Sequence, residues 1–574
     1  IKINMEGGTV NSIQGCKTST TPVTITRIEI NITGGTVIED VSGNSSNSVT
    51  GGIDITIKDA TVNGAICANI GANNVKGGTN ITVENSKIGG TIIGGSKRGT
   101  LSGNTNITIA GGSTVGGSVY GSNTDGGSLT GDTGVTIAGG STVSGDVYGG
   151  GNGGILEGST NVTITGGSTV AQNVYGGGSG NNKVTKNTQV VVTGGSTVHG
   201  SVYGGGRFSS VQDIATVRID NEGGTVDGSI YGGGYEFQGS VSETEVTVTG
   251  GTVTGSVYGG GYRGDVTGEN GTTVAITGGT INTNVFGGGS LNGTDGKVTG
   301  SAKVTVTGGS IKGNLFGGGD SASKAGTGTG SSTVTVGGSA KIGDNLMGIC
   351  LNGVDIKNGV DNFTFAPDTP LTNDSKIFVV LPSDFVKDTV IATGARQGDE
   401  THLFLTGNGA GKLATQFNAD ENSITVFDPR GIVPDVEGKN IYANGTELLL
   451  EQGEDDTKTI VSFRPAGSEE HTPYYLLDVS GATGNTETGY DLSSYMVYGG
   501  SKDADLSGDT TITMNGGKVK YLYGGGMAAV TGNTKVTMEG GKVEAIYGGS
   551  NGKKIDGDTY VTITGGKVTD TVYG

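Results

Sequence analysis

Short runs in which polar and apolar residues alternate recur along most of this chain. Residues 161–165, "NVTIT", place Val162 and Ile164 between polar neighbours. A two-residue period is typical of a β-strand with one buried face, so we expect these two side chains to point into a core. Residues 168–175, "STVAQNVY", predict a second strand with its valines inside, and Leu156 marks a third short strand.

Glycine runs separate the predicted strands. Gly166 and Gly167 follow the first strand, and the triplet at 176–178 follows the second. Glycine supplies the positive-φ conformations of tight corners. Three short strands and three glycine-rich corners per repeat, with no helical pattern between them, predict an all-β fold of the parallel β-helix (β-solenoid) type. A β-propeller would need longer strands and a period of roughly 40 residues or more.

One aromatic position sets the period of the repeat. Its series runs from a loose copy at Gln14 to Met347, which is 333 residues in 12 intervals, or about 28 per coil. A second series from Tyr498 to Tyr573 repeats every 25 residues. We therefore expect coils of about 25–30 residues, stacked at the inter-strand spacing of about 4.8 Å. The ring is present in the first series at Tyr120, Tyr148, Tyr175, Tyr203, Tyr231, Tyr258, Phe286 and Phe316.

A small polar residue precedes the first strand of many repeats. Asn, Asp and Ser side chains bond to nearby backbone groups and tolerate unusual dihedral angles. The recurrence of these side chains at one position predicts that they stack from coil to coil as a polar ladder along one corner of the solenoid. The residues are Asn104, Asp132, Ser159, Asn187, Asp509, Asn533 and Asp558.

The repeat is interrupted once. Residues 1–350 predict a first block of about 13 coils, 351–490 an irregular β segment with seven of the eight prolines, and 491–574 a second block of about four coils. Within the irregular segment we expect wider coils to about residue 436, with a separate small β domain as the alternative. We expect a new start near 439–450, "KNIYANGTELLL". The last coil stops part-way through its repeat, so we expect a piece of a longer chain.

Composition and charge narrow the possible partners. The chain has 118 glycines among 574 residues and 32% hydrophobic residues, which suits a narrow solenoid that buries few side chains per coil. Its net charge of −19 is spread along the chain without a basic patch, so nucleic acid is not an expected partner. No apolar run is long enough to predict membrane insertion.

The three cysteines do not predict a disulfide framework or a zinc site, because Cys16, Cys67 and Cys350 are too dispersed along the chain. We expect them to be small buried side chains.

The repeat, of the type "VTITGGTVxGxVYGGG", together with the segment "SKIFVVLP…TVIATG" at 375–394, resembles the repeat regions of large surface proteins of anaerobic, gut-type bacteria. That resemblance covers most of the chain. It implies a secreted, adhesin-like β-helix protein on the bacterial cell surface, attached to the wall or filamentous. We therefore expect a non-enzymatic extracellular stalk, adhesin or filament subunit. Its expected partners are neighbouring repeats or other copies, packed end to end or side by side.

The recurring ring is the main candidate for a binding site. Counting by two from Val174 places Tyr175 outward, unless a glycine-rich corner turns the ring inward. Stacked rings would fix the register of the coils. Alternatively, a flat aromatic strip would bind host or microbial glycans or pack on another solenoid. The candidate binding residues are Tyr148, Tyr175, Tyr203, Tyr231, Tyr258, Phe286 and Phe316.

Other candidate chemistry is weaker, and we expect no cofactor and no metal site. Asp399, Glu400 and His402 lie close together in "GDETH" and form the best local acid–base or metal candidate, although an ordinary polar loop is favoured. A carbohydrate-active enzyme with its site in 351–490 is the third alternative. The glycine runs lack the aspartates of calcium-binding repeats and precede no helix, which excludes a phosphate-binding loop. Strand propensity explains the outward threonines without ice binding.

Overall fold

A computed structural model describes most of the chain, which divides into two compact units, Ile1–Ile377 and Phe378–Gly574. Each unit is described by itself. The described residues are 1–16, 23–45, 47–290, 296–320, 332–342, 348–350, 362–366, 377–381, 389–397, 399–407, 414–418, 421–427, 433–464, 474–479, 481–503 and 505–574.

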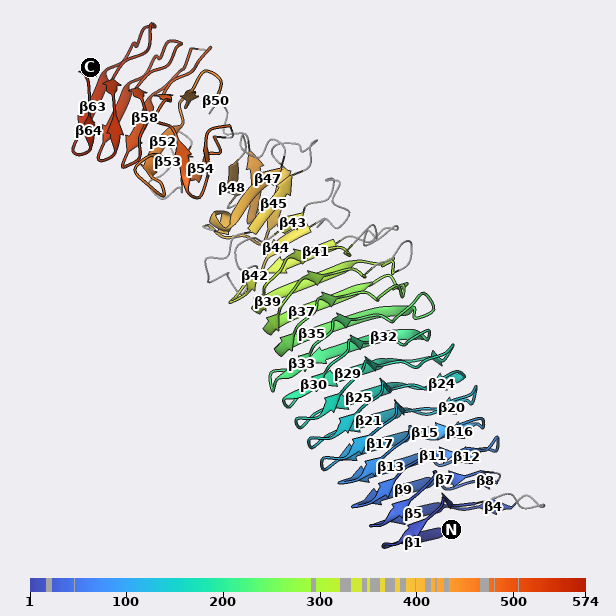
Figure 1. Cartoon of the computed structure of the whole chain (residues 1–574). Coiled ribbons are helices and arrows are strands. Elements are labelled where there is room, and N and C mark those ends of the chain that lie inside the picture. The colour runs from blue at the N-terminus through green and yellow to red at the C-terminus, as the bar shows by residue number, and fades with distance from the viewer. Residues whose placement is uncertain are drawn as a thin grey trace. The chain divides into compact units, whose positions relative to one another are not determined.

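The first unit is a parallel β-solenoid, as predicted (Figure 1). A typical coil has four short strands, one more than expected, because "STV" and "VY" belong to separate strands. A turn of three residues divides them, and Ser118 in this turn bonds to the next coil. The four strands are β16 (Leu101–Ser102), β17 (Thr105–Ala110), β18 (Thr114–Val115) and β19 (Val119–Tyr120).

Equivalent residues of successive coils lie in register. Val135 pairs with Val162, and Val162 pairs with Val190, all in parallel strands. The main strand of each coil forms one row: β1 (Lys2–Met5), β5 (Ile28–Ile32), β9 (Ile53–Lys58), β13 (Thr79–Glu84), β17, β21 (Thr133–Ile137), β25 (Thr160–Ile164), β29 (Thr188–Val192), β32 (Ser210–Ile219), β35 (Val241–Val253), β37 (Thr272–Ile281), β39 (Ala302–Ile311), β41 (Ser332–Val336) and β44 (Asn362–Phe365).

The strand that carries the aromatic ring forms a second continuous sheet of 12 strands. Its members are β3 (Ile13–Gln14), β7 (Val41–Asn44), β11 (Ile66–Asn69), β15 (Ile92–Ser96), β19, β23 (Val147–Tyr148), β27 (Val174–Tyr175), β31 (Val202–Tyr203), β34 (Ile230–Tyr231), β36 (Val257–Tyr258), β38 (Val285–Phe286) and β40 (Leu315–Phe316).

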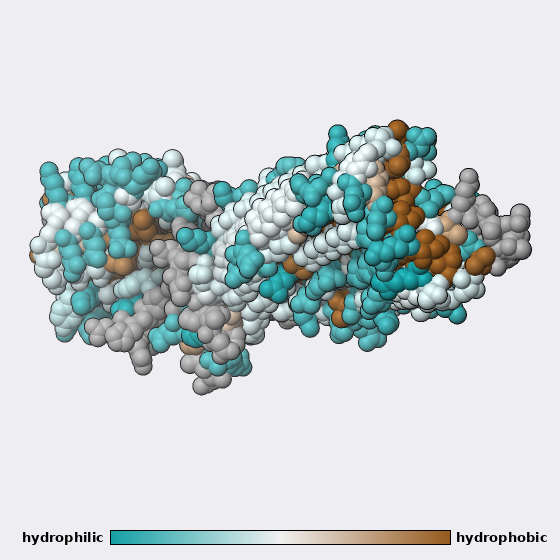
Figure 2. All heavy atoms as spheres, turned by 90° about the horizontal axis from the view of Figure 1, so that it is seen from below, coloured by the Kyte–Doolittle hydropathy of each residue, from teal (hydrophilic) through white to brown (hydrophobic). Residues whose placement is uncertain are grey.

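The predicted inward side chains form the core of the coils. Leu156, Val162, Ile164, Val170 and Val174 are all fully buried. Outward positions between them carry polar residues, which are partly or fully exposed. Hydrophobic atoms are sparse on the face shown in Figure 2, apart from a band at the end where β1 lies. Exposed apolar side chains of the first coils are Ile1, Val10, Val23 and Ile38.

Antiparallel pairs replace the expected parallel coils in the described strands β46 (Thr389–Thr393), β48 (Ala414–Asn418) and β49 (Ser423–Phe427) of the irregular segment, so this part of the prediction is wrong. Asn422, just before β49, has a φ of 48°, a left-handed conformation that Asn tolerates and that lets the chain reverse. A local hairpin thus replaces the long crossover of a coil.

A solenoid restarts in the second unit near the predicted "KNIYANGTELLL". Strands β51 (Asn440–Tyr442) and β52 (Glu447–Gln452) pair parallel with β57 (Met496–Tyr498) and β58 (Thr510–Met514). The second block therefore begins before residue 491. The later coils of this block contain β59 (Tyr521–Tyr523), β60 (Thr534–Met538), β62 (Ala545–Tyr547), β63 (Thr559–Ile563) and β65 (Val572–Tyr573).

Between the first two coils of the block, the chain forms four antiparallel strands. They are β53 (Lys458–Arg464), β54 (Tyr475–Leu476), β55 (Gly484–Asn485) and β56 (Gly489–Asp491).

Candidate functional site

Eight aromatic rings form one continuous stack in the first unit, which we call the aromatic ladder. It runs from Tyr120 to Phe316 through the seven predicted residues Tyr148, Tyr175, Tyr203, Tyr231, Tyr258, Phe286 and Phe316. Neighbouring ring centroids lie 4.7–4.9 Å apart and neighbouring planes differ by at most 9°. This spacing matches the separation of hydrogen-bonded strands, so the stack follows directly from the register of the coils.

The stacking agrees with the interpretation that the rings fix the register of the coils, whereas the alternative of an exposed aromatic strip is contradicted. Six of them, from Tyr148 to Phe286, expose only 2–8% of their surface. Each ring does follow a fully buried valine, isoleucine or leucine in a two-residue strand and so points away from the core. The next coils cover the ring faces, and flanking polar groups meet the hydroxyls at the edges. Tyr148 donates to Asp146 Oδ2 (3.0 Å) and Tyr258 donates to Asp320 Oδ2 (3.2 Å).

The first glycine after each ring is required by close approach. A Cβ on Gly149 would lie 2.3 Å from the carbonyl oxygen of Gly176, and one on Gly176 would lie 2.2 Å from that of Gly204. None of these three residues has a left-handed φ. The corner after the main strand differs, because Gly166 and Gly167 have φ of 65° and 74°. The two glycine runs of a coil therefore serve different purposes.

A buried threonine ladder runs inside the solenoid, and the sequence interpretation missed it. Thr160 opens the main strand β25 and donates from Oγ1 to the carbonyl oxygen of Gly176 across the coil (2.5 Å). Counting back two residues from Val162 would have placed it inside. Thr79, Thr105, Thr133, Thr188, Thr244, Thr272, Thr510 and Thr534 make the same bond to Gly94, Gly121, Gly149, Gly204, Gly259, Gly287, Gly524 and Gly548.

The predicted polar corner ladder is confirmed at five of its seven residues, Asn104, Asp132, Asn187, Asp509 and Asn533. The Oδ1 atom of Asn104 accepts from the backbone N–H of Asp132 (2.9 Å), and Asp132 Oδ1 accepts from that of Ser159 (2.8 Å). Asn187, Asp509 and Asn533 bond to the following coil in the same way. Each side chain thus links two successive coils.

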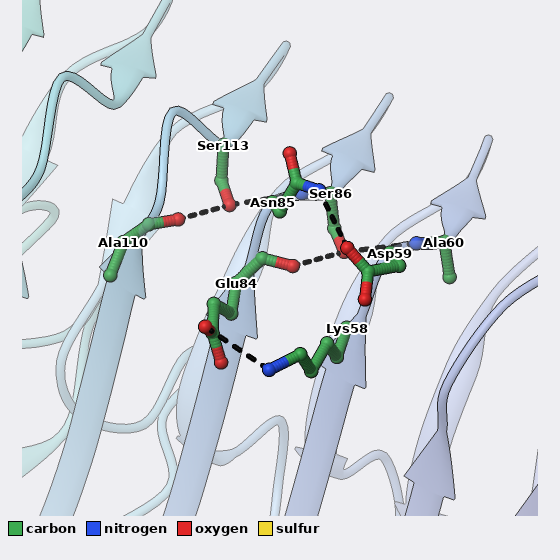
Figure 3. A network of polar contacts seen from close by, with 8 residues as sticks. All are labelled: Lys58, Asp59, Ala60, Glu84, Asn85, Ser86, Ala110 and Ser113. Atoms are coloured by element: carbon green, nitrogen blue, oxygen red, sulfur yellow. Dashed lines mark hydrogen bonds and ion pairs between the residues drawn. The ribbon is translucent and has the colours of Figure 1, made fainter.

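A second corner carries buried serines (Figure 3). Ser113 Oγ accepts from the backbone N–H of Ser86 (3.1 Å) and donates to the carbonyl oxygen of Ala110 (2.5 Å). Ser86 Oγ in turn accepts from the N–H of Ala60 (3.1 Å) and donates to the carbonyl oxygen of Glu84 (2.7 Å). One hydroxyl therefore closes its own turn and joins the adjacent coil.

The surroundings of the ladder tyrosines favour the neutral phenol form. Burial raises the pKa of Tyr148, Tyr175, Tyr203 and Tyr231 well above its usual value, and it raises that of Tyr258 to about 12, with a contribution from Asp320. A row of stacked, uncharged rings suits packing along the solenoid. It offers little ring surface to a ligand.

A second ladder of five rings stacks in the second unit with centroids 4.5–5.0 Å apart. Its first ring, Tyr442, was not among the predicted series, although it precedes a strand-like run in "KNIYANGTELLL". The others are Tyr498, Tyr523, Tyr547 and Tyr573.

In the "GDETH" candidate, the carboxylate of Asp399 makes a hydrogen bond to the local backbone. Asp399 begins the 3₁₀ helix η1 (Asp399–His402) and is buried, and its Oδ2 accepts from the backbone N–H of Arg396 (2.8 Å). The side chain of Glu400 lies outside the described residues, and His402 is half-buried. Asp399 therefore holds the turn that leads into η1.

Two cysteines lie within the described side chains. Cys67 occupies an aromatic position and is buried, as predicted, and burial raises its thiol pKa to about 12. Cys16 is half-buried and accepts from Asn47 Nδ2 through its sulfur. The side chain of Cys350 lies outside the described residues. A thiol held neutral at Cys67 behaves as a small apolar side chain.

Comparison with protein-family models, curated proteins and solved structures gave no match to this chain. Across the described ranges, no group of three or more His, Cys, Asp and Glu side chains could hold a metal ion. No helix in the described part of the chain is long and apolar enough to cross a membrane.

Proposed function

We propose that this chain is a non-enzymatic structural protein of a bacterial cell surface, in which the solenoid is a stiff stalk, adhesin or filament subunit. The observation that carries the proposal is the unbroken register of the ladders. From Tyr120 to Phe316 every coil continues the same ring stack, and most coils there repeat the same buried threonine bond.

Stiffness follows from this repetition. Bending the solenoid would separate parallel backbone pairs, stacked rings and corner hydrogen bonds on the same side of several coils at once. Each of these contacts is modest, but they are made at every coil, so their resistance to bending adds along the stack.

The location outside the cell rests on the sequence. The repeat resembles adhesin-like surface proteins, and the net charge of −19 favours solubility and self-repulsion. Protease treatment of intact cells that produce the full-length protein tests this location. Cleavage of the protein while a cytoplasmic marker stays intact supports it, and full protection that ends only on lysis contradicts it.

Electron microscopy of the purified native protein tests the structural role. Long uniform fibres with the β-strand repeat along their axis support a filament subunit that packs end to end with other copies. Isolated stiff rods support a stalk or adhesin. Flexible, kinked particles would contradict the proposal, because they would show that the ladders do not stiffen the solenoid.

A further inference from the structure

Three consecutive coils carry large side chains in the loop that follows the glycine triplet. The preceding coils have Asn152–Gly153 and Ser179–Gly180 at these positions. The three loops instead place aromatic and charged residues beside the aromatic ladder. We call this group the loop platform; it consists of Arg207, Phe208, Tyr235, Glu236, Phe237, Tyr262 and Arg263.

Contacts with each other and with the aromatic ladder hold two rings of the platform, Tyr235 and Tyr262, in place. Tyr235 and Tyr262 stack on each other with centroids 5.1 Å apart and planes 11° apart. Each meets a ladder ring edge to face, Tyr235 on Tyr203 at 5.5 Å and Tyr262 on Tyr231 at 5.8 Å. Both are half-buried, and Phe237 is 56% exposed. In contrast to the ladder, these rings reach the surface.

The backbone of the platform is strained at the same position of each loop. Phe208, Glu236 and Arg263 have φ of 54°, 67° and 64°, where Gly153 and Gly180 have 82° and 54°. A left-handed conformation is unfavourable for residues with a Cβ, and glycine would relieve it. Strained residues are concentrated at functional sites. Asp125 has a φ of 53° at the equivalent position of an earlier coil, but Asp tolerates this conformation better than Phe, Glu or Arg does. Three such residues in successive coils therefore favour a use of their side chains besides folding.

The charges of the platform are paired, one pair lying within it and the other joining it to Asp146. Arg263 Nη1 lies 2.6 Å from Glu236 Oε2, and Arg207 Nη1 lies 3.8 Å from Asp146 Oδ2. Arg207 also lies over the ring of Tyr235, 6.0 Å from its centroid. Paired charges give little attraction for a polyanion, but they leave carboxylate and guanidinium groups that can bond to hydroxyls.

We propose that the loop platform binds a neutral carbohydrate chain. The C–H faces of sugar rings would pack on Tyr262, Phe237 and Phe208. Tyr235 would support Tyr262 from its other side, and sugar hydroxyls would bond to Glu236 and Arg263. The site is distinct from the buried ladder. Binding is a property of the purified chain wherever the protein acts, so failure of this inference would leave the structural role standing.

Affinity electrophoresis of the whole chain tests the proposal, with native gels that contain xylan, mixed-linkage β-glucan, galactomannan or soluble starch, and heparin as the polyanion. We expect at least one neutral polysaccharide to retard the protein and heparin not to. The double variant Tyr235→Ala/Tyr262→Ala should weaken that binding about tenfold or more. The matched control is Tyr521→Ala, because Tyr521 is also half-buried and also meets ladder rings edge to face, at 6.3 Å and 6.1 Å.

Phe208→Gly separates binding from folding. It relieves the left-handed strain, so the melting temperature should not fall, while the affinity for the polysaccharide decreases. No retardation by any of the four neutral polysaccharides, retardation by heparin alone, or unchanged affinity of the double tyrosine variant would each overturn the proposal. A melting temperature lowered by Phe208→Gly with affinity unchanged would show that the side chain serves the fold.

Discussion

Thr160 and Gly176 are joined across the interior of one coil, where the threonine Oγ1 donates to the glycine carbonyl oxygen at 2.5 Å. The bond gives a hydrogen-bond partner to the carbonyl oxygen of Gly176, which is the same oxygen that a Cβ on Gly149 would meet. It also ties the main strand to the corner after the aromatic ring. Nine coils of the two units share this arrangement.

The substitution Thr160→Val should remove this bond while keeping the shape of the side chain. We expect the free energy of unfolding to fall by about 1–2 kcal/mol, because a buried carbonyl oxygen loses its partner. Urea unfolding followed by circular dichroism measures the change. The control is Thr163→Val on the outward face, where Val191 already occupies the paired position of the next coil. Equal losses in the two variants would contradict a special role for the buried hydroxyl.

Glycine at the ring corner should tolerate no side chain. Gly149→Ala places a Cβ 2.3 Å from a backbone carbonyl oxygen, so the coils must separate locally. We expect a loss of about 3 kcal/mol or more in the free energy of unfolding, at the upper end of overpacking effects.

Gly167→Ala is the comparison for this variant. Gly167 has a φ of 74°, but a Cβ added there would have no atom within 4 Å, so only the left-handed strain of about 1–2 kcal/mol applies. If Gly167→Ala destabilised the protein as much as Gly149→Ala, close approach would not be the reason for the first glycine of the triplet.

The sequence predicted the solenoid, its period, its inward residues and its polar corner, because each repeats at a fixed phase. It did not predict that Tyr175 is buried, since an outward direction in a strand does not reveal what covers the face. Alternation could have found Thr160, but threonine is common in strands, so its presence at the start of a strand did not single it out. The antiparallel pairing of β46 with β49 lies where the period is lost, and only long-range pairing settles such segments.

The candidate binding residues also show what the repeat pattern alone could not predict. The seven predicted ring positions do stack, but the rings that reach the surface, Tyr235 and Tyr262, lie in loops whose sequences differ from coil to coil. A search for periodicity passes over such residues because they depart from the repeat. The sequence does show that Phe208, Glu236 and Arg263 stand where earlier coils have Gly153 and Gly180. It does not show that these residues adopt a left-handed φ, which only the structure reveals.

The aromatic ladder should depend on rings and little on hydroxyls. Tyr175→Phe should change the free energy of unfolding by less than about 1 kcal/mol, because Phe286 and Phe316 already stack at 4.7 Å in the same ladder. Tyr175→Ala should cost about 3–5 kcal/mol, because it opens a cavity between two rings. Urea unfolding of both variants measures the difference. A large loss in Tyr175→Phe would show instead that the phenol oxygen is structurally required.

Alkaline pH should destabilise the ladder through its phenols. Burial and Asp320 raise the pKa of Tyr258 from 10.0 to about 12, so the unfolded chain loses this proton first. The stabilisation that protonated Tyr258 adds to the free energy of unfolding is fully present below the unfolded pKa of 10.0. It is lost as the pH rises through the folded pKa of about 12. The free energy of unfolding, measured by urea at several values between about pH 9 and 12, should therefore fall more steeply in the wild type than in Tyr258→Phe. Identical slopes in the two proteins would mean that Tyr258 ionises as readily in the folded solenoid as in the unfolded chain, and that its ring edge is open to water.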